Sequence, residues 1–197
     1  MAHQAPGLNK ILILVLFGLL AWIAGCDNSS HFVNAAGKTI TTSAGITLVN
    51  GVPANGKLFL LYPGTRDTSY IISYRDGKEN GVFKTFYPNG KLRELRFFVN
   101  GWKEGEHKGW YEDGARAYVY MFKNDMFEGV VKEWSPQGHL FRDMNYEKGM
   151  EKGSQKIYYA NGKIKSNYVI KDGIRYGLLG TKNCSNVSDS VFRTTKN

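Results

Sequence analysis

Residues 81–104 read GVFKTFYPNGKLRELRFFVNGWKE, and this stretch sets the period of the chain. Its first glycine recurs every 24 residues without a slip, at Gly81, Gly105, Gly129, Gly153 and Gly177. A second set of glycines keeps the same interval, at Gly90, Gly114, Gly138 and Gly162. A unit of this size cannot bury a core alone, so the sequence predicts a stack of repeats in which each unit contacts its neighbours.

Four complete units follow one another along the chain. They span residues 74–97, 98–121, 122–145 and 146–169, and a partial unit covers 170 to about 177. Residues 55–63 match residues 80–88 at a displacement of 25 residues, which predicts an irregular unit at the N-terminal end of the array.

Each unit contains two extended stretches joined by turn residues. Residues 81–87 reach the turn Pro88-Asn89-Gly90, and residues 91–98 return to Asn100-Gly101. Asn-Gly and Asp-Gly pairs supply the positive backbone dihedrals that hairpin turns need. We therefore predict an all-β fold, an elongated antiparallel meander of tandem β-hairpins with a 24-residue period. The abundance of Tyr, Phe, Trp and Gly is typical of many short strands joined by tight turns.

Two columns of large apolar side chains recur in register, and we predict that they form the core. The aromatic column is Phe86, Trp110, Trp134 and Tyr158, and the second column is Phe98, Phe122, Tyr146 and Ile170. A lysine column precedes the aromatic column by two residues, at Lys84, Lys108, Lys132 and Lys156. Because side chains alternate along a strand, the lysine and aromatic columns should share one side.

The lysine column is the candidate site for an anionic ligand. Two strands per unit would separate successive lysines by about 10 Å, beyond the screening length of about 8 Å at physiological salt, so their mutual repulsion is tolerable. Such a ladder beside aromatic rings could bind an anionic surface or polymer. The alternative is that the lysines only solubilise this side and cover the rings with their methylene stems.

The N-terminal segment is typical of an exported lipoprotein. Residues 11–24 form an uncharged apolar run of signal-peptide length, and the run ends in Ile23-Ala24-Gly25-Cys26, which resembles the bacterial lipobox. This resemblance implies cleavage after residue 25 and attachment of lipid to Cys26. An ordinary signal peptide or an uncleaved anchor is the alternative. We expect a signal peptide at 1–25, a flexible tether at 26–38, the repeat array at 39–183 and a C-terminal tail at 184–197.

Charge and export together limit the partners. The chain carries a net charge of +9, and removal of residues 1–25, which contain one lysine and no acidic residue, would leave 25 basic and 17 acidic residues, a net of +8. Export to a bacterial cell envelope, periplasmic or surface-exposed, disfavours a nucleic-acid role. The expected contacts are the membrane through the lipid anchor, a protein partner, and an anionic lipid or glycan.

The sequence contains no catalytic or metal-binding motif. His107 and His139 occupy different columns of the repeat, where packing or surface roles are expected, and Cys184 has no neighbouring His or Cys. Glu104, Glu128 and other carboxylates fall in or near turns, as solvated loop residues do. We expect no enzyme, no cofactor and no metal site. A metal or redox accessory role built on Cys184 or on the repeat histidines is the least favoured alternative.

The residues from Tyr74 to Leu92, which include Tyr87-Pro88-Asn89-Gly90, resemble the MORN repeat variant of bacterial proteins, including the family labelled YwqK-type antitoxins. The resemblance covers about residues 50–177. It implies an elongated meander of hairpins and a role in membrane association, in protein scaffolding or in neutralising a toxin. Two departures stand out, because Asp125 replaces a turn glycine and Ser135 replaces the tyrosine of Tyr-Pro-Asn-Gly. The resulting hypothesis is a non-catalytic envelope lipoprotein that binds a protein or membrane surface, with an antitoxin-like inhibitor as the alternative.

Overall fold

A computed structural model of the chain describes residues 31–180, all of which lie in strands, turns or connecting loops. No helix long and apolar enough to cross a membrane is found among these residues. The strands are β1 Phe32–Asn34, β2 Ile40–Ser43, β3 Ile46–Val49, β4 Val52–Pro53, β5 Gly56–Leu61, β6 Thr68–Arg75, β7 Lys78–Phe86, β8 Leu92–Val99, β9 Trp102–Lys103, β10 Gly105–Trp110, β11 Arg116–Lys123, β12 Met126–Trp134, β13 Leu140–Glu147, β14 Met150–Tyr158, β15 Ile164–Lys171 and β16 Ile174–Leu178.

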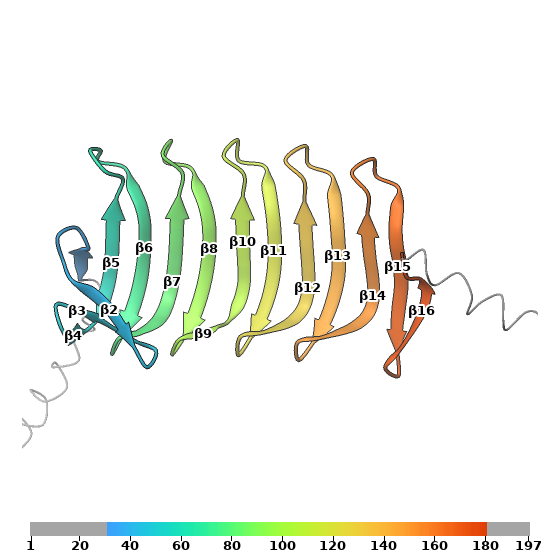
Figure 1. Ribbon diagram of the computed structural model, residues 1–197, viewed down its shortest axis with the longest axis horizontal. Helices are drawn as coiled ribbons and strands as arrows, with labels where there is room; N and C mark the ends of the chain where they lie inside the picture. The colour runs from blue at the N-terminus through green and yellow to red at the C-terminus, as the bar shows by residue number, and fades with distance from the viewer. Residues whose placement is uncertain (1–30, 181–197) are drawn as a thin grey trace, which may run out of the picture.

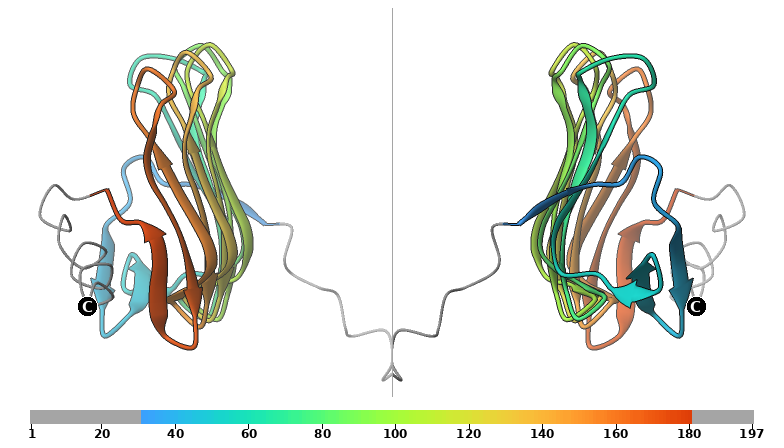
Figure 2. Two further views of the ribbon diagram at one scale, coloured as in Figure 1. Left: turned by 90° about the vertical axis from the view of Figure 1, so that its right-hand side faces the viewer. Right: turned by 90° about the vertical axis from the view of Figure 1, so that its left-hand side faces the viewer.

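One long sheet dominates the fold and confirms the predicted all-β meander. From β5 to β16 the strands pair in chain order and antiparallel, with the short β9 attached to β8 (Figure 1). Figure 2 shows this sheet edge-on, as a single curved layer, with the smaller sheet β2-β3-β4 beside one of its faces. Each repeat unit contributes two strands, so the 24-residue period is the step from one hairpin to the next.

Turn residues fix the register of the hairpins at both edges. At one edge, two-residue turns such as Asp76-Gly77 and Asn100-Gly101 have positive φ at both positions, the geometry that the sequence predicts for Asn-Gly and Asp-Gly. Asp125, which replaces the turn glycine in one unit, also takes up a positive φ of 63°. At the other edge, loops such as Tyr87–Lys91 are closed by backbone hydrogen bonds.

Hydrogen bonds from turn backbone to side chains also link neighbouring units at the two-residue turns. In four successive units, an Asn or Glu side chain just before the first strand glycine accepts a hydrogen bond from a turn N–H about 20 residues further on. The accepting residues are Asn55, Asn80, Glu104 and Glu128, and the bonds measure 2.7–3.1 Å. Glu104 and Glu128 are therefore structural acceptors, which corrects the expectation that they are only solvated loop residues.

A second set of hydrogen bonds, which we call the tyrosine ladder, links neighbouring units along the opposite edge of the sheet. The hydroxyl groups of Tyr62, Tyr87 and Tyr111 each donate to a backbone carbonyl of the aromatic column in the next unit, at Phe86, Trp110 and Trp134 respectively. These bonds measure 2.6, 2.8 and 2.6 Å. Ser135 occupies the next tyrosine position, where its Oγ accepts a bond from the His139 N–H within its own loop, so the ladder stops there.

The N-terminal residues cap one end of the sheet. Val49 of β3 packs against a cluster that includes Leu58 and Ile72, and Thr47 N–H donates to the carbonyl of Gly77 at 2.7 Å. We call the face of the long sheet that carries this cluster the inner face, and the opposite face the outer face.

The structure corrects the predicted boundaries near this cap. Residues 32–34, assigned to the tether from their small and polar surroundings, form β1, which pairs parallel with β5. Residues 40–53, assigned to the repeat array, form the separate small sheet. A parallel pairing has no local turn signal, because its two strands are joined by a long connection.

The most buried column of the repeats differs from the two predicted core columns. Val131 and Gln155 are 3% and 0% exposed, His107 is 3% exposed, and all three follow the strand glycine by two residues, on the inner face. Of the predicted core columns, Phe98 is buried, whereas the aromatic column Phe86, Trp110, Trp134 and Tyr158 and the other members Phe122, Tyr146 and Ile170 are half-buried. The sheet is a single layer, so even its large side chains keep one side in contact with water.

Candidate anion-binding surface

Strand alternation places the lysine column on the outer face. Phe83 packs against the inner-face cluster, and Lys84 follows it in β7, so its side chain points to the opposite side. A register shift falls between Thr85 and Phe86 in the β7–β8 pair and recurs in the three later units, with the extra residue in the second strand of each pair. Alternation along the first strand is therefore unbroken, and the lysine and aromatic columns share the outer face.

A row of residues crosses the outer face and contains all four lysines. Between the lysines lie the residues directly opposite them on neighbouring strands, and the row reads Ile71, Lys84, Leu95, Lys108, Val119, Lys132, Asp143, Lys156 and Asn167. The first half of the row is apolar between its lysines and the second half is polar. Val119 is only 9% exposed although it lies on an open sheet face. Val119 lies directly opposite Lys108 and Lys132 on the two neighbouring strands.

The four lysines differ in their charge environment. Lys108 forms an ion pair with Glu106 at 2.6 Å, and Lys132 lies 3.7 Å from Asp143. Within residues 31–180, Lys84 and Lys156 have no carboxylate within ion-pair distance. The column is thus two neutralised and two free cations, which the sequence pattern did not distinguish.

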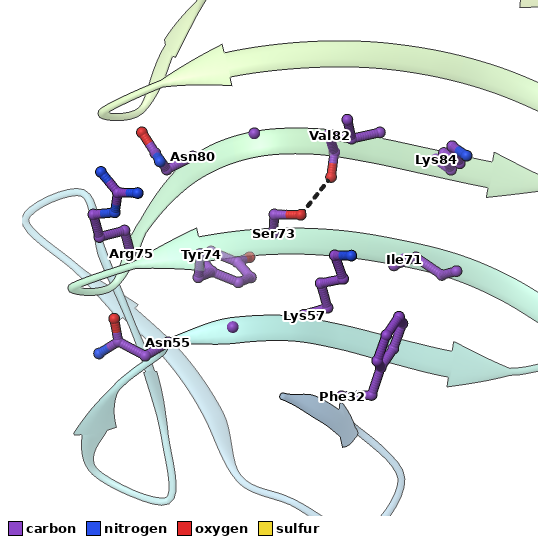
Figure 3. A pocket seen from close by; sticks show the side chains of 12 residues that line it. Phe32, Asn55, Lys57, Ile71, Ser73, Tyr74, Arg75, Asn80, Val82 and Lys84 are labelled. Atoms are coloured by element: carbon purple, nitrogen blue, oxygen red, sulfur yellow. Dashed lines mark hydrogen bonds between the residues drawn. The ribbon is translucent and has the colours of Figure 1, made fainter. Parts of the chain in front are cut away.

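Lys84 also borders an open groove at the N-terminal end of the outer face (Figure 3). The groove has a volume of about 830 Å³ and is lined by residues from β1, β5, β6 and β7. Its charged lining residues are Lys57, Arg75 and Lys84, and no carboxylate lines it. Apolar contact surface comes from Phe32, Ile71 and Val82, and the Lys57 ammonium lies 5.0 Å from the centre of the Phe32 ring.

The inner face carries charges as well, and three of its carboxylates are each bonded to a tyrosine and an arginine. Glu94 accepts bonds from Tyr118 at 3.0 Å and from Arg96 at 2.8 Å. Two further groups repeat this arrangement, with Glu133 between Tyr120 and Arg142 and with Glu151 between Tyr168 and Arg175. Burial, together with the nearby Glu94 carboxylate, raises the pKa of Tyr118 to about 12, so its hydroxyl stays a neutral donor. Each group is close to neutral overall. The inner face also carries two cations that form no ion pair among the described residues, Arg93, which bonds Thr85, and Lys103, which lies over the Phe122 ring.

The three Tyr–Glu–Arg groups could not be predicted by comparing equivalent positions of the repeats. Their members come from different columns and meet only when the strand register is known, as in the pair Glu133 and Arg142. By contrast, the residues between the lysines do recur every 24 residues, at 71, 95, 119, 143 and 167, and this spacing would have shown the full row.

The two repeat histidines have separate surroundings. His107 is buried between the rings of Phe98 and Phe122, with ring centres 5.6 and 4.7 Å away, and its Nε2 lies 2.8 Å from the Phe97 carbonyl oxygen. Burial lowers the pKa of His107, so the neutral imidazole is the form that fits. His139 is exposed in a loop. Among the described residues no cluster of three or more His, Cys, Asp or Glu could hold a metal ion.

The remaining predicted features lie outside the described residues. They are the predicted signal peptide at 1–25, the predicted lipid-attachment residue Cys26, Cys184 and the predicted tail at 184–197.

Two segments of the chain match a family model described as the MORN repeat variant, at residues 79–100 and 151–172. The two matches start three repeat periods apart, and each runs from two residues before a strand glycine to the first residue of a two-residue turn. No curated protein matches the chain. The protein therefore contains MORN-type repeats, and repeats of this kind often bind membranes or proteins.

Proposed function

We propose that this protein is a non-catalytic lipoprotein of the bacterial envelope whose repeat sheet binds an anionic membrane surface through its outer face. The observation that carries the proposal is that Lys84, a member of the lysine column, also lines the groove at the N-terminal end of the outer face. Three cations face this groove without a carboxylate, whereas the inner-face carboxylates Glu94, Glu133 and Glu151 are each bonded to a Tyr and an Arg. Lipid headgroups with a negative charge would be attracted to the three cations that line this groove.

The ion pairs within the lysine column provide a matched test. The double substitution Lys57→Gln with Lys84→Gln removes two free cations, whereas Lys108→Gln with Lys132→Gln removes two cations that already face a carboxylate. Both change the net charge equally and lie on strands of the same sheet. A lysine near an anionic surface contributes about 1 kcal/mol, so the first pair should weaken binding about 30-fold and the second pair clearly less.

The binding experiment must keep the predicted anchor from dominating the result. The full chain is reconstituted in nanodiscs of neutral phosphatidylcholine. Vesicles in which about one lipid in three is the anionic phosphatidylglycerol are then added from outside. Flotation then reports only the contacts that the exposed part of the chain makes with the added vesicles. We expect binding to anionic vesicles that weakens with salt, and none to neutral vesicles. Equal binding of both double variants would contradict the proposal, and binding to soluble acidic glycans alone would assign the same surface to a glycan.

Lipid attachment at Cys26 is a separate part of the proposal and needs its own test. It is supported by the apolar run and by the tetrapeptide Ile23-Ala24-Gly25-Cys26. Mass spectrometry of the mature protein should show an acylated N-terminal Cys26 peptide, and Cys26→Ser should accumulate a precursor that retains residues 1–25. An unmodified Cys26 in the mature protein would refute the anchor without affecting the anionic surface.

The antitoxin-like alternative rests on the family resemblance alone. It predicts that a protein captured from envelope extract is a toxin, and that the captured protein loses toxicity when bound. A lipid-anchored inhibitor would require a toxin that is exported or delivered to the envelope.

A further inference from the structure

The C-terminal edge of the long sheet exposes a short apolar strand. Ile174, Tyr176 and Leu178 of β16 are 55%, 55% and 54% exposed. They lie on the outer face, opposite Lys171, Val169 and Asn167 of β15. The N-terminal edge is covered by β1, whereas no strand of the described residues pairs with the far side of β16 (Figure 1).

The backbone of β16 has a defined set of outward hydrogen-bonding groups. The two-residue turn Asp172-Gly173 has positive φ at both positions and closes on the pair Lys171 and Ile174, which is therefore hydrogen-bonded. Because bonded and non-bonded pairs alternate in an antiparallel ladder, Tyr176 and Leu178 also bond to β15. The N–H and C=O groups of Arg175 and Gly177 then point away from the sheet. An edge with such free groups is a template for another strand.

The sequence of β16 is complementary to itself in one antiparallel register. If two copies pair with Tyr176 at the centre, Ile174 faces Leu178 of the second copy and Tyr176 faces Tyr176. Arg175 faces Gly177, so the two outward pairs of backbone groups bond to each other and no arginine lies opposite an arginine. The Arg175 guanidinium is already bonded to Glu151 at 2.9 Å, and Gly177 has no side chain to keep a second backbone away.

We propose that β16 pairs with β16 of a second copy of this chain, antiparallel and about a two-fold axis at Tyr176. The two long sheets would then join into one sheet with both outer faces on the same side, since Ile174, Tyr176 and Leu178 of the two copies share a face. The contact involves five residues from each copy and is smaller than stable interfaces of about 1,200 Å² or more, so the dimer dissociates on dilution.

A disulfide test distinguishes this register from other contacts. In a non-hydrogen-bonded antiparallel pair the Cα atoms are about 4.5 Å apart, within the range that a disulfide spans. In the full chain carrying Cys184→Ser, Tyr176→Cys should therefore cross-link into a covalent dimer under mild oxidation. Ile174→Cys is the matched control, because it has the same exposure but faces Leu178 of the second copy. We expect at least a tenfold larger dimer fraction for Tyr176→Cys, and Cys26 contributes equally to both variants.

The backbone contribution is tested by a second substitution. Arg175→Pro removes an N–H that points away from β15, so the hairpin keeps its own bonds, whereas Arg175→Ala keeps that N–H. Added to Tyr176→Cys, the proline should abolish cross-linking and the alanine should preserve it. Sedimentation of the unsubstituted chain should show a dimer that dissociates as the concentration falls. The proposal is overturned if the two cysteine variants cross-link equally or not at all. It is also overturned if cross-linking appears only after deletion of residues 181–197, because the edge is then occupied by the chain itself.

Discussion

Restoring the interrupted tyrosine ladder should stabilise the array. Ser135 stands where Tyr62, Tyr87 and Tyr111 stand in the other units, and those tyrosines bond the next unit at 2.6–2.8 Å. Its backbone N–H bonds the His139 carbonyl as the Tyr111 N–H bonds the Ala115 carbonyl, both at 2.8 Å, so the loop can present a tyrosine in the same way. Ser135→Tyr should therefore direct a hydroxyl at the Tyr158 carbonyl.

The size of the effect follows from one added hydrogen bond. A typical intramolecular bond contributes about 1 kcal/mol of net stability, and for a protein of this length 1 kcal/mol raises the melting temperature by roughly 2–4 °C. Ser135→Phe is the control, because it supplies the ring without the hydroxyl. Tyr111→Phe should show the reverse change, because it removes the existing bond to the Trp134 carbonyl and should lower the free energy of unfolding by about 1 kcal/mol.

Thermal unfolding followed by circular dichroism measures the global effect, and amide hydrogen exchange locates it. In a repeat array the stabilisation should be confined to the units on either side of the new rung, here the strands β12 to β15. The reasoning fails if Ser135→Tyr is no more stable than Ser135→Phe, or if Tyr111→Phe leaves both the melting temperature and the exchange rates unchanged.

Two further substitutions test the inner face. His107→Gln should keep the fold, because Gln155 holds the same position two units later and bonds the opposite strand in the same way. Burial lowers the pKa of His107 in the folded state, so the unfolded chain takes up a proton first as the pH falls below about 6.5, and stability is lost there. Chemical denaturation between pH 7 and 5 should show a smaller loss for the glutamine variant, and identical slopes would contradict the assignment. Gly109→Ala should cost about 1–3 kcal/mol, because an added Cβ would overlap the Tyr118 ring, and this extra cost should disappear in a Tyr118→Ala background.

Features that repeat identically were the ones that sequence analysis could predict. The strand glycines and the lysine column keep one residue type at one spacing, and most of the turns keep a glycine, so the period, the hairpins and the shared face of lysines and aromatics follow from the sequence. The most buried column escaped prediction because it contains Phe83, His107, Val131 and Gln155, four different chemistries. His107 and Gln155 are equivalent only in what their side chains bond, the backbone of Phe97 and of Asn145. The other two members, Phe83 and Val131, are apolar, so the column alternates between apolar and hydrogen-bonding side chains and cannot be recognised from residue identity.

The two faces of the single-layer sheet differ in how far their side chains depend on one another. Inner-face side chains bond to one another across strands, so a change in one column must be matched in the next strand, as with Glu133 and Arg142. Lys84 has no such partner among the described residues, and its substitution leaves no buried group unsatisfied. An unpaired cation on a surface therefore contributes little to stability, and the fold alone does not require a lysine there. It follows that Lys57→Gln with Lys84→Gln should leave the melting temperature within about 2 °C of the unsubstituted chain while vesicle binding falls, and a comparable loss of stability would instead make these lysines part of the scaffold.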